Sequence, residues 1–143
     1  MLVRLLYASR AVDTLDHEEL SAILRQSRTR NPEHGITGVL CCCFEQRIFM
    51  QVLEGGRSAV NRLYNRIAAD PRHTQVELLK YEEIGERRFA GWSMGQVNMA
   101  RLNPALLLKY SERATLDPYA VSGQVSMALF EELVATASVV GQP

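Results

Sequence analysis

Ile48-Phe49-Met50-Gln51-Val52-Leu53-Glu54-Gly55-Gly56 is typical of a β-strand that ends in a glycine turn. Side chains alternate between the two faces of a strand, so Phe49, Gln51 and Leu53 share a face and leave an amide in the middle of an apolar surface. An amide buried without a hydrogen-bond partner costs a few kcal/mol. The sequence therefore predicts a partner for Gln51. This strand alone fits a core glutamine bonded to backbone as well as it fits a functional amide.

A strand and a helix are predicted before this stretch. Residues 2–9 alternate so that Tyr7 lies on an apolar face with a hydroxyl to satisfy, which also fits a core tyrosine bonded to a backbone carbonyl. A helix then begins at the capping box of Asp16 and Glu19. It must end before Asn31-Pro32, because proline disfavours helix in the preceding residue. One face of this helix carries Leu20, Ile23, Leu24 and Ser27.

The elements that follow indicate the fold class. Residues 35–43 form a strand that pairs with the Gln51 strand, and further strands are expected at 75–84 and 92–99. Between the Gln51 strand and strand 75–84, we expect a helix that is capped by Ser58 and ended by Asp70-Pro71. Its amphipathic face consists of Val60, Leu63, Tyr64, Ile67 and Ala68. The order β-α-β-β-α-β with an added fifth strand predicts an α+β fold of the ferredoxin-like type. Both helices should pack on one face of a mixed sheet.

The C-terminal part, residues 100–143, is expected to form helices at 102–108 and 121–139. The second helix carries an apolar stripe made of Val125, Leu129, Leu133 and Thr136, with Phe130 beside it. That stripe predicts packing on the open face of the sheet or against another subunit. We therefore divide the chain into a domain at 1–99 and a C-terminal helical extension at 100–143.

The composition is ordinary for a soluble globular domain, with 143 residues, 47% hydrophobic and 22% charged. Sixteen basic and sixteen acidic residues give no net charge, which argues against nucleic acid as the main partner. No apolar run approaches the roughly 20 residues that span a membrane, and the N-terminus lacks the layout of a signal peptide. We expect a cytoplasmic protein.

The three cysteines, Cys41, Cys42 and Cys43, are adjacent on a predicted strand. Neighbouring residues of a strand point to opposite faces, so the three cannot form a tetrahedral metal site. They are expected to be reduced thiols. No metal is expected.

Five segments, in order and spacing, resemble the BLUF domain, a flavin-based sensor of blue light. The segments are Leu5-Leu6-Tyr7-Ala8-Ser9-Arg10, Ser27-Arg28-Thr29-Arg30-Asn31-Pro32-Glu33-His34-Gly35-Ile36-Thr37-Gly38, the Phe-x-Gln-x-Leu-Glu-Gly strand, Asp70-Pro71-Arg72-His73 and Phe89-Ala90-Gly91-Trp92-Ser93-Met94. The resemblance covers residues 1–99. One motif alone is weak, whereas five in order are specific. Arg30 departs from the pattern, since relatives often carry Asn or His at that position.

The resemblance implies non-covalent FAD, with the isoalloxazine ring between the two helices and its edge toward the sheet. The chain has no G-x-G-x-x-G or Walker sequence, so a Rossmann-type flavoprotein is not predicted. Ile23 and Ile67 are implied to flank the ring. The cofactor-binding residues implied are Tyr7, Ile23, Ser27, Arg28, Asn31, Gln51, Arg66, Ile67, Asp70, Arg72 and His73. Taken alone, Arg66, Arg72 and His73 also fit a solvated helix end.

The resemblance further implies a photoswitch made of Tyr7, Gln51, Trp92 and Met94. Light is expected to drive an electron and a proton from Tyr7 to the flavin, followed by rapid return, with no substrate turned over. The Gln51 amide is left rearranged, by rotation or tautomerisation, with a new hydrogen bond to the flavin carbonyl. Glutamine suits this role because its amide carries a donor and an acceptor. Trp92 and Met94 should share a face of strand 92–99, and one of them is implied to move inward. Both also fit plain core positions.

The signal is expected to leave through contacts with an unidentified protein partner. Leu106-Leu107-Leu108-Lys109-Tyr110-Ser111 resembles the tail of short stand-alone BLUF proteins, which assemble as stacked pentameric rings, so a homo-oligomer is expected. Two alternatives stay open. A flavin reductase would also need room for a nicotinamide. An acylphosphatase-like enzyme of the same fold would need a phosphate-binding glycine loop with an arginine, and Tyr7-Ala8-Ser9-Arg10 offers only the arginine.

Overall fold

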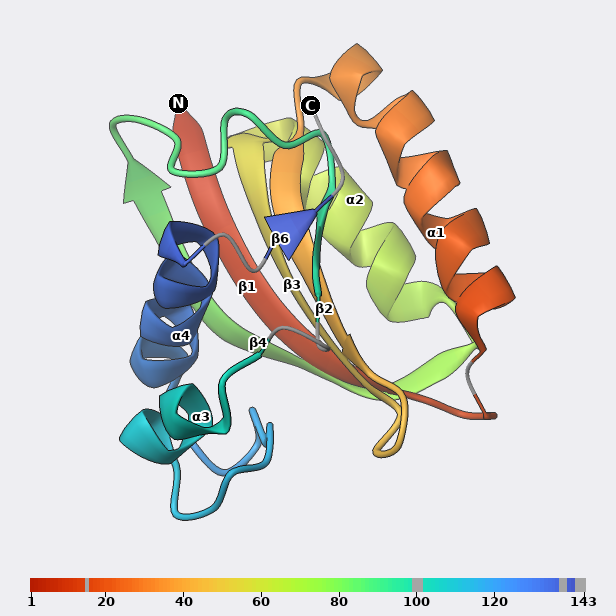
Figure 1. The fold of residues 1–143 in the computed structure, drawn as a ribbon. Coiled ribbons are helices and arrows are strands. Elements are labelled where there is room, and N and C mark those ends of the chain that lie inside the picture. The colour runs from red at the N-terminus through yellow and green to blue at the C-terminus, as the bar shows by residue number, and fades with distance from the viewer. Residues whose placement is uncertain (15, 99–101, 137–138, 141–143) are drawn as a thin grey trace.

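The computed structural model describes residues 1–14, 16–98, 102–136 and 139–140, and within them the chain forms a mixed sheet in the order β4-β1-β3-β2-β5-β6 (Figure 1). The strands are β1 (Leu2–Ala11), β2 (Thr37–Cys43), β3 (Ile48–Gly56), β4 (His73–Ile84), β5 (Gly95–Val97) and β6 (Val139–Val140). The pairs β4–β1, β1–β3 and β3–β2 are antiparallel, and β5 is parallel to β2. The ferredoxin-like order with an added strand is confirmed. The short β6 is a further strand, and it includes Val139, where the sequence predicted the end of a helix over residues 121–139.

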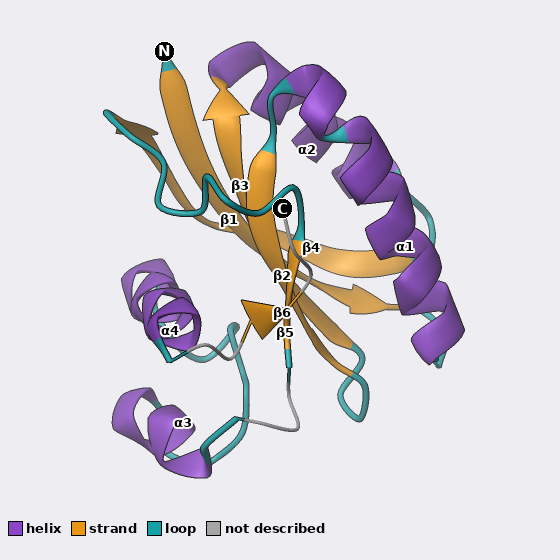
Figure 2. Cartoon of the chain, turned by 45° about the horizontal axis from the view of Figure 1, so that its top comes forward, coloured by secondary structure: helices purple, strands orange, loops and turns teal. Residues whose placement is uncertain are grey.

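The helices lie in two layers, one on each side of the sheet (Figure 2). Helices α1 (His17–Arg30) and α2 (Arg57–Ala69) cover one face, as expected, with the short 3-10 turn η1 (Pro32–His34) after α1. Helices α3 (Pro104–Tyr110) and α4 (Gly123–Ala135) lie on the opposite side. None of the helices within the described ranges combines the length and the hydropathy that a bilayer span requires.

Local sequence explains where α1 and α2 begin. The Asp16 carboxylate accepts a hydrogen bond from the Glu19 backbone N–H at 2.7 Å, which confirms the predicted cap of α1. The predicted cap of α2 at Ser58 is wrong, because the helix already begins at Arg57 with Gly56 as its N-cap. Strand β3 runs into α2 without a loop, and the Arg57 backbone N–H donates to the carbonyl of Met1 at 3.1 Å.

Helix α4 covers the face of the sheet that α1 and α2 leave open. Its buried side chains Leu129, Phe130 and Leu133 belong to the same core cluster as Leu6 and Met50 of the sheet. Ser122 caps this helix by accepting a hydrogen bond from the Val125 backbone N–H at 3.1 Å. At Gly123, a Cβ would lie 1.8 Å from the Leu79 carbonyl oxygen, so glycine lets α4 approach β4. The apolar stripe of α4 thus packs within the chain.

The region around residues 92–99 differs most from its prediction. Strand β5 holds only residues Gly95–Val97, and residue 99 of the expected strand lies outside the described residues. The chain bends at Ser93 and Met94 rather than extending. Alternation therefore does not apply, and the expectation that Trp92 and Met94 share a face is wrong. Trp92 packs against the core cluster beneath α4, whereas Met94 is fully buried in the cluster beneath α1 and α2.

A buried ion pair lies in the sheet, on the α4 side of β1 and β3. The Glu54 side chain is 0% exposed and lies 2.8 Å from the Arg4 guanidinium, whose other arm reaches Glu82 at 2.7 Å. Glu54 also accepts hydrogen bonds from the backbone N–H groups of Arg88 at 3.1 Å and Phe89 at 2.7 Å. The carboxylate therefore joins three strands to the loop that leads to Trp92.

Candidate functional site

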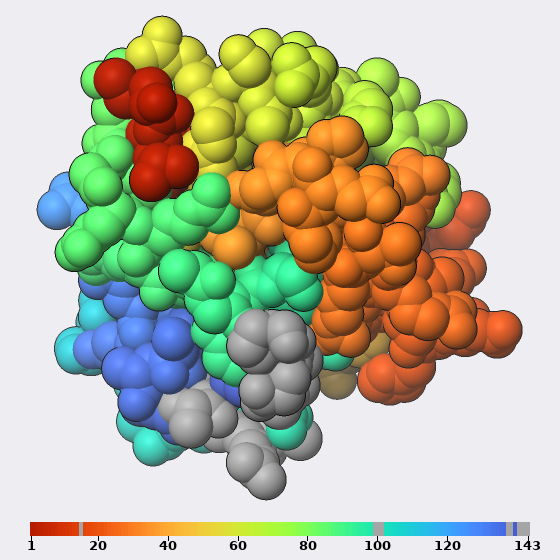
Figure 3. Space-filling view, turned by 90° about the horizontal axis from the view of Figure 1, so that it is seen from above, coloured from red at the N-terminus to blue at the C-terminus, as the bar shows by residue number. Residues whose placement is uncertain are grey.

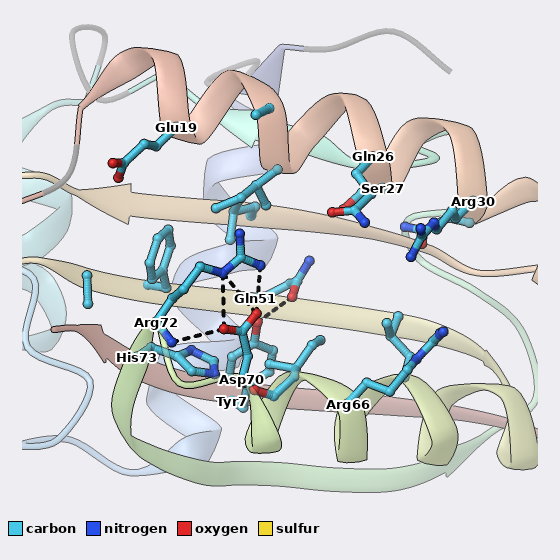
Figure 4. A pocket seen from close by; sticks show the side chains of 18 of the residues that line it. Tyr7, Glu19, Gln26, Ser27, Arg30, Gln51, Arg66, Asp70, Arg72 and His73 are labelled. Carbon is cyan, nitrogen blue, oxygen red and sulfur yellow. Dashed lines mark hydrogen bonds and ion pairs between the residues drawn. The ribbon is translucent and has the colours of Figure 1, made fainter. Parts of the chain in front are cut away.

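A cavity of about 510 Å³ opens between α1, α2 and the sheet (Figure 4). Its size lies within the range of about 300–1,000 Å³ that is typical of small-molecule sites. The structure brings together in its lining most of the residues that the sequence singled out as cofactor contacts. These are Tyr7, Ile23, Ser27, Asn31, Gln51, Arg66, Ile67, Asp70, Arg72 and His73.

The floor of the cavity is built by two strands held in register. Tyr7 of β1 lies directly opposite Gln51 of β3, and both side chains are buried. The Tyr7 hydroxyl donates to the Gln51 side-chain oxygen at 2.5 Å. Burial raises the pKa of Tyr7, and the Tyr64 ring, with its centroid 5.7 Å away, raises it further. Tyr7 is therefore a neutral hydrogen-bond donor at physiological pH. Its hydroxyl is the hydrogen-bond partner that the buried position of Gln51 predicted.

The other end of the Gln51 amide contacts the segment before β5. Its Nε2 donates to the Met94 sulfur at 3.3 Å. Two side chains of the α1 end hold the same segment by its carbonyls: Arg28 Nε donates to Met94 at 3.2 Å, and Asn31 Nδ2 donates to Ser93 at 2.8 Å. Tyr7, Gln51 and Met94 thus form one hydrogen-bonded row from the cavity floor to the chain entering β5.

The walls come from the facing stripes of α1 and α2. Ile23 and Ile67 are only half-buried, although they lie on the apolar stripes of their helices, because they border the cavity. Other lining residues on α1 were not predicted as site residues, although most of them lie three or four positions from Ile23 or Ser27. These are Glu19, Ala22, Gln26 and Arg30, and Leu63 is the matching case on α2.

Polar groups gather where α2 ends and β4 begins. Arg72 holds Asp70 through an ion pair at 2.6 Å, and its hydrogen bonds lower the pKa of the Asp70 carboxyl to about 2. The His73 ring lies 3.0 Å from the Ser9 hydroxyl and also contacts the Ile67 carbonyl. Arg72 is paired with Asp70 although its side chain is 71% exposed, and His73 has partners on β1 and α2.

Three of the predicted site residues lie outside the cavity lining: Arg28, Trp92 and Met94. Arg28 was expected along the polar side of the ring. Ser27 and Asn31 are four residues apart on one helical face, whereas Arg28 is turned about 100° away and reaches the segment at Met94 instead. Met94 still contacts Gln51, whereas Trp92 does not line the cavity and packs against the core cluster on the α4 side.

The residues present fit a flavin. The half-buried isoleucines on facing helices provide two apolar walls for a planar ring system. At the floor, the Gln51 amide offers both a donor and an acceptor in a water-poor setting, where hydrogen bonds are strong. Ser27 on α1 and Asn31 at the end of that helix add polar groups to the wall. An apolar slot with a few convergent polar groups is what a small planar cofactor requires.

Comparisons with known proteins identify the family of the chain. Residues 2–95 match the family described as BLUF, sensors of blue-light using FAD. The structure of BlsA in its photo-activated state has a TM-score of 0.82 at 31% identity and covers 100% of this chain and 99% of that one. BlrB, a BLUF protein in the dark state, has a TM-score of 0.78 at 35% identity and covers 95% and 96%.

Curated relatives match over a smaller share of their length. Photoactivated adenylate cyclase subunit beta of Euglena longa is 38% identical over 94 residues, which cover 65% of this chain and 11% of that protein. The blue light- and temperature-regulated antirepressor BluF of Escherichia coli (strain K12) is 32% identical over 89 residues, 62% of this chain and 22% of that protein. This chain thus spans about a tenth to a fifth of these relatives, and the likeness is to their sensor portion rather than to a catalytic domain. The chain belongs to the BLUF family of blue-light sensors that use FAD.

Proposed function

We propose that this chain reports blue light by rearranging the hydrogen bonds of Gln51 beside bound FAD. The observation that carries the proposal is the row from Tyr7 through Gln51 to Met94, with bonds of 2.5 Å and 3.3 Å. FAD supplies the absorption of blue light and a transient acceptor for an electron and a proton. Tyr7 supplies that proton from a hydroxyl that burial keeps neutral.

Gln51 is the residue whose state changes. Its oxygen accepts from Tyr7 and its Nε2 donates to Met94, so a rotated or tautomerised amide cannot keep both bonds. A change at this amide therefore alters the hydrogen bond to the Met94 sulfur, while Arg28 donates to the Met94 backbone carbonyl. The row offers a direct route from the cavity floor to the chain that enters β5.

A light-minus-dark absorption spectrum of the FAD-bound protein tests this function. We expect a small red shift in blue light that reverses in the dark. Tyr7→Phe removes one hydroxyl and little volume, so the variant should fold and stay yellow but lose the shifted state. A bleached spectrum, as from a covalent thiol adduct, would contradict the proposal. None of the three cysteines lines the cavity, and burial and then the neighbouring Cys43 raise the pKa of Cys42 to about 12.

We further propose that the chain assembles with copies of itself, as stacked rings of five, and passes its signal to a protein partner. Support comes from the resemblance of residues 106–111 to the tails of short relatives and from Leu108, which is 55% exposed on α3. Leu108→Glu is expected to reduce the oligomer to smaller species in size-exclusion chromatography with light scattering. Leu78→Glu is the matched control, since Leu78 is 52% exposed on the edge strand β4. An unchanged oligomer in Leu108→Glu would rule out α3 as the contact.

A further inference from the structure

The end of α1 and the chain that leads into β5 lie side by side. Seen from above, the end of α1, in orange, lies against the green segment that leads toward β5 (Figure 3). The backbone carbonyls of residues 92–94 all accept hydrogen bonds across this contact. The Gly38 backbone N–H donates to residue 92 at 2.9 Å, Asn31 Nδ2 to residue 93 at 2.8 Å and Arg28 Nε to residue 94 at 3.2 Å. Three consecutive peptide groups are thus held in place.

Arg28 differs from the other two anchors of this segment. Its side chain lines no part of the cavity, whereas Asn31 does, and Gly38 acts through its backbone. Its partner is also the residue whose sulfur accepts from Gln51. Among the described residues, no carboxylate lies within ion-pairing distance of Arg28. The half-buried guanidinium therefore directs a charged donor at the Met94 carbonyl, and charged donors form stronger hydrogen bonds than neutral ones.

We infer that Arg28 is a positioning residue for the photoswitch, which holds Met94 where its sulfur can accept from Gln51. The inference rests on the proposed function of Gln51. When the rearranged amide releases the sulfur, the bond from Arg28 to the backbone carbonyl does not involve that amide and persists. Met94 then stays within reach of Gln51, which favours return to the dark arrangement. The red-shifted state should therefore live longer when Arg28 is removed.

Arg28→Met tests this role, because methionine keeps an unbranched stem and a good helix propensity but removes the donor and the charge. Arg25→Met is the matched control, since Arg25 is exposed on the same helix and does not line the cavity. Fluorescence titration of the flavin-free full chain gives the FAD affinity, and decay of the light-minus-dark spectrum gives the recovery rate.

The two measurements should separate in Arg28→Met. We expect FAD affinity within about twofold of the wild type, because the side chain lies outside the cavity. Dark recovery should slow about tenfold, the size of one lost hydrogen bond to a charged group. Arg25→Met should match the wild type in both. A loss of FAD affinity as large as the slowing would make Arg28 a cofactor contact and overturn the inference. Unchanged or faster recovery would overturn it too, even if the free energy of unfolding fell.

A double-mutant cycle shows whether Arg28 acts through Met94. Met94→Leu removes the sulfur that accepts from Gln51 and changes the core volume little. In this background, Arg28→Met should change the recovery rate by less than about twofold, because no sulfur is left to position. Equal slowing in both backgrounds would mean that Arg28 acts by another route, and the inference would be wrong.

A second variant covers the case in which Arg28→Met does not fold. Arg28→Lys keeps the positive charge at the end of α1 but has a methylene where arginine has Nε, so the same slowing is expected. The wild type distinguishes the two levels of the argument. A wild-type chain without a red shift defeats the proposed function itself. A wild-type chain with a red shift and normal recovery in the Arg28 variants defeats this inference alone.

Discussion

Gln51→Leu is expected to abolish the red-shifted state while the protein stays yellow. Leucine fills a similar volume on the apolar floor, so the cavity between α1 and α2 should keep its shape. It has neither donor nor acceptor, and both contacts of the Gln51 amide, to Tyr7 and to Met94, disappear with it. Light-minus-dark spectra of wild type and variant, each saturated with FAD, measure the loss directly.

The same substitution carries a stability cost that must be separated from the loss of function. It leaves the buried Tyr7 hydroxyl without its acceptor, which costs about 1–3 kcal/mol. The double variant Tyr7→Phe with Gln51→Leu removes both polar groups, so urea denaturation should show part of this stability restored. Its spectrum should still fail to respond to light. A normal red shift in Gln51→Leu would show that another group carries the switch.

Sequence periodicity predicted those parts of the structure in which the chain is regular. The strand that carries Gln51 was predicted, and its alternation placed Gln51 on the cavity side. The predicted turn at Gly55 and Gly56 is wrong, because both glycines belong to β3, which continues directly into α2. Alternation also put Tyr7 on an apolar face, and the β1–β3 register then sets the side chains of Tyr7 and Gln51 opposite each other. These predictions succeeded because buried positions recur at every second residue of a strand, and this period is visible in the local sequence.

Where the backbone leaves regular geometry, the same reasoning failed. The bend at Ser93 and Met94 sends the two side chains expected on one face, Trp92 and Met94, into different cores. Strand β4 begins at His73, two residues before its predicted start. It passes through Gln75 at φ 51, a left-handed conformation that no strand pattern anticipates. The hydrogen bond from Arg28 to the Met94 carbonyl was missed as well, because only the tertiary arrangement brings the end of α1 beside that segment.

Glu54→Ala is expected to lower the free energy of unfolding by about 3–5 kcal/mol, the cost of removing one partner of a buried ion pair. The Arg4 side chain, 6% exposed, would keep only Glu82, which is itself 34% exposed. The backbone N–H groups of Arg88 and Phe89 would lose their acceptor. Urea denaturation followed by circular dichroism measures the effect.

Glu83→Ala is the matched control for this loss. Glu83 pairs with Arg57 at 3.4 Å, and both side chains are more than half exposed. Exposed pairs of this kind contribute about 0–1 kcal/mol, so the control should unfold close to the wild type. Equal losses in the two variants would mean that burial of the Arg4–Glu54 pair is not what stabilises the sheet.

Glu54 also connects β3, the strand that carries Gln51, to the side of the sheet that the C-terminal helices cover. It is three residues from Gln51 on β3 but points to the opposite face, where it holds the loop at Arg88 and Phe89. The Arg88 guanidinium in turn pairs with Glu131 of α4, and the same loop continues to Met94. In Glu54→Ala, amide hydrogen exchange at Arg88 and Phe89 should therefore accelerate more than exchange at the centre of β3, under conditions that keep the variant folded. Uniform acceleration would mean that Glu54 supports global stability only, and the strand that carries Gln51 would then need another connection to α4.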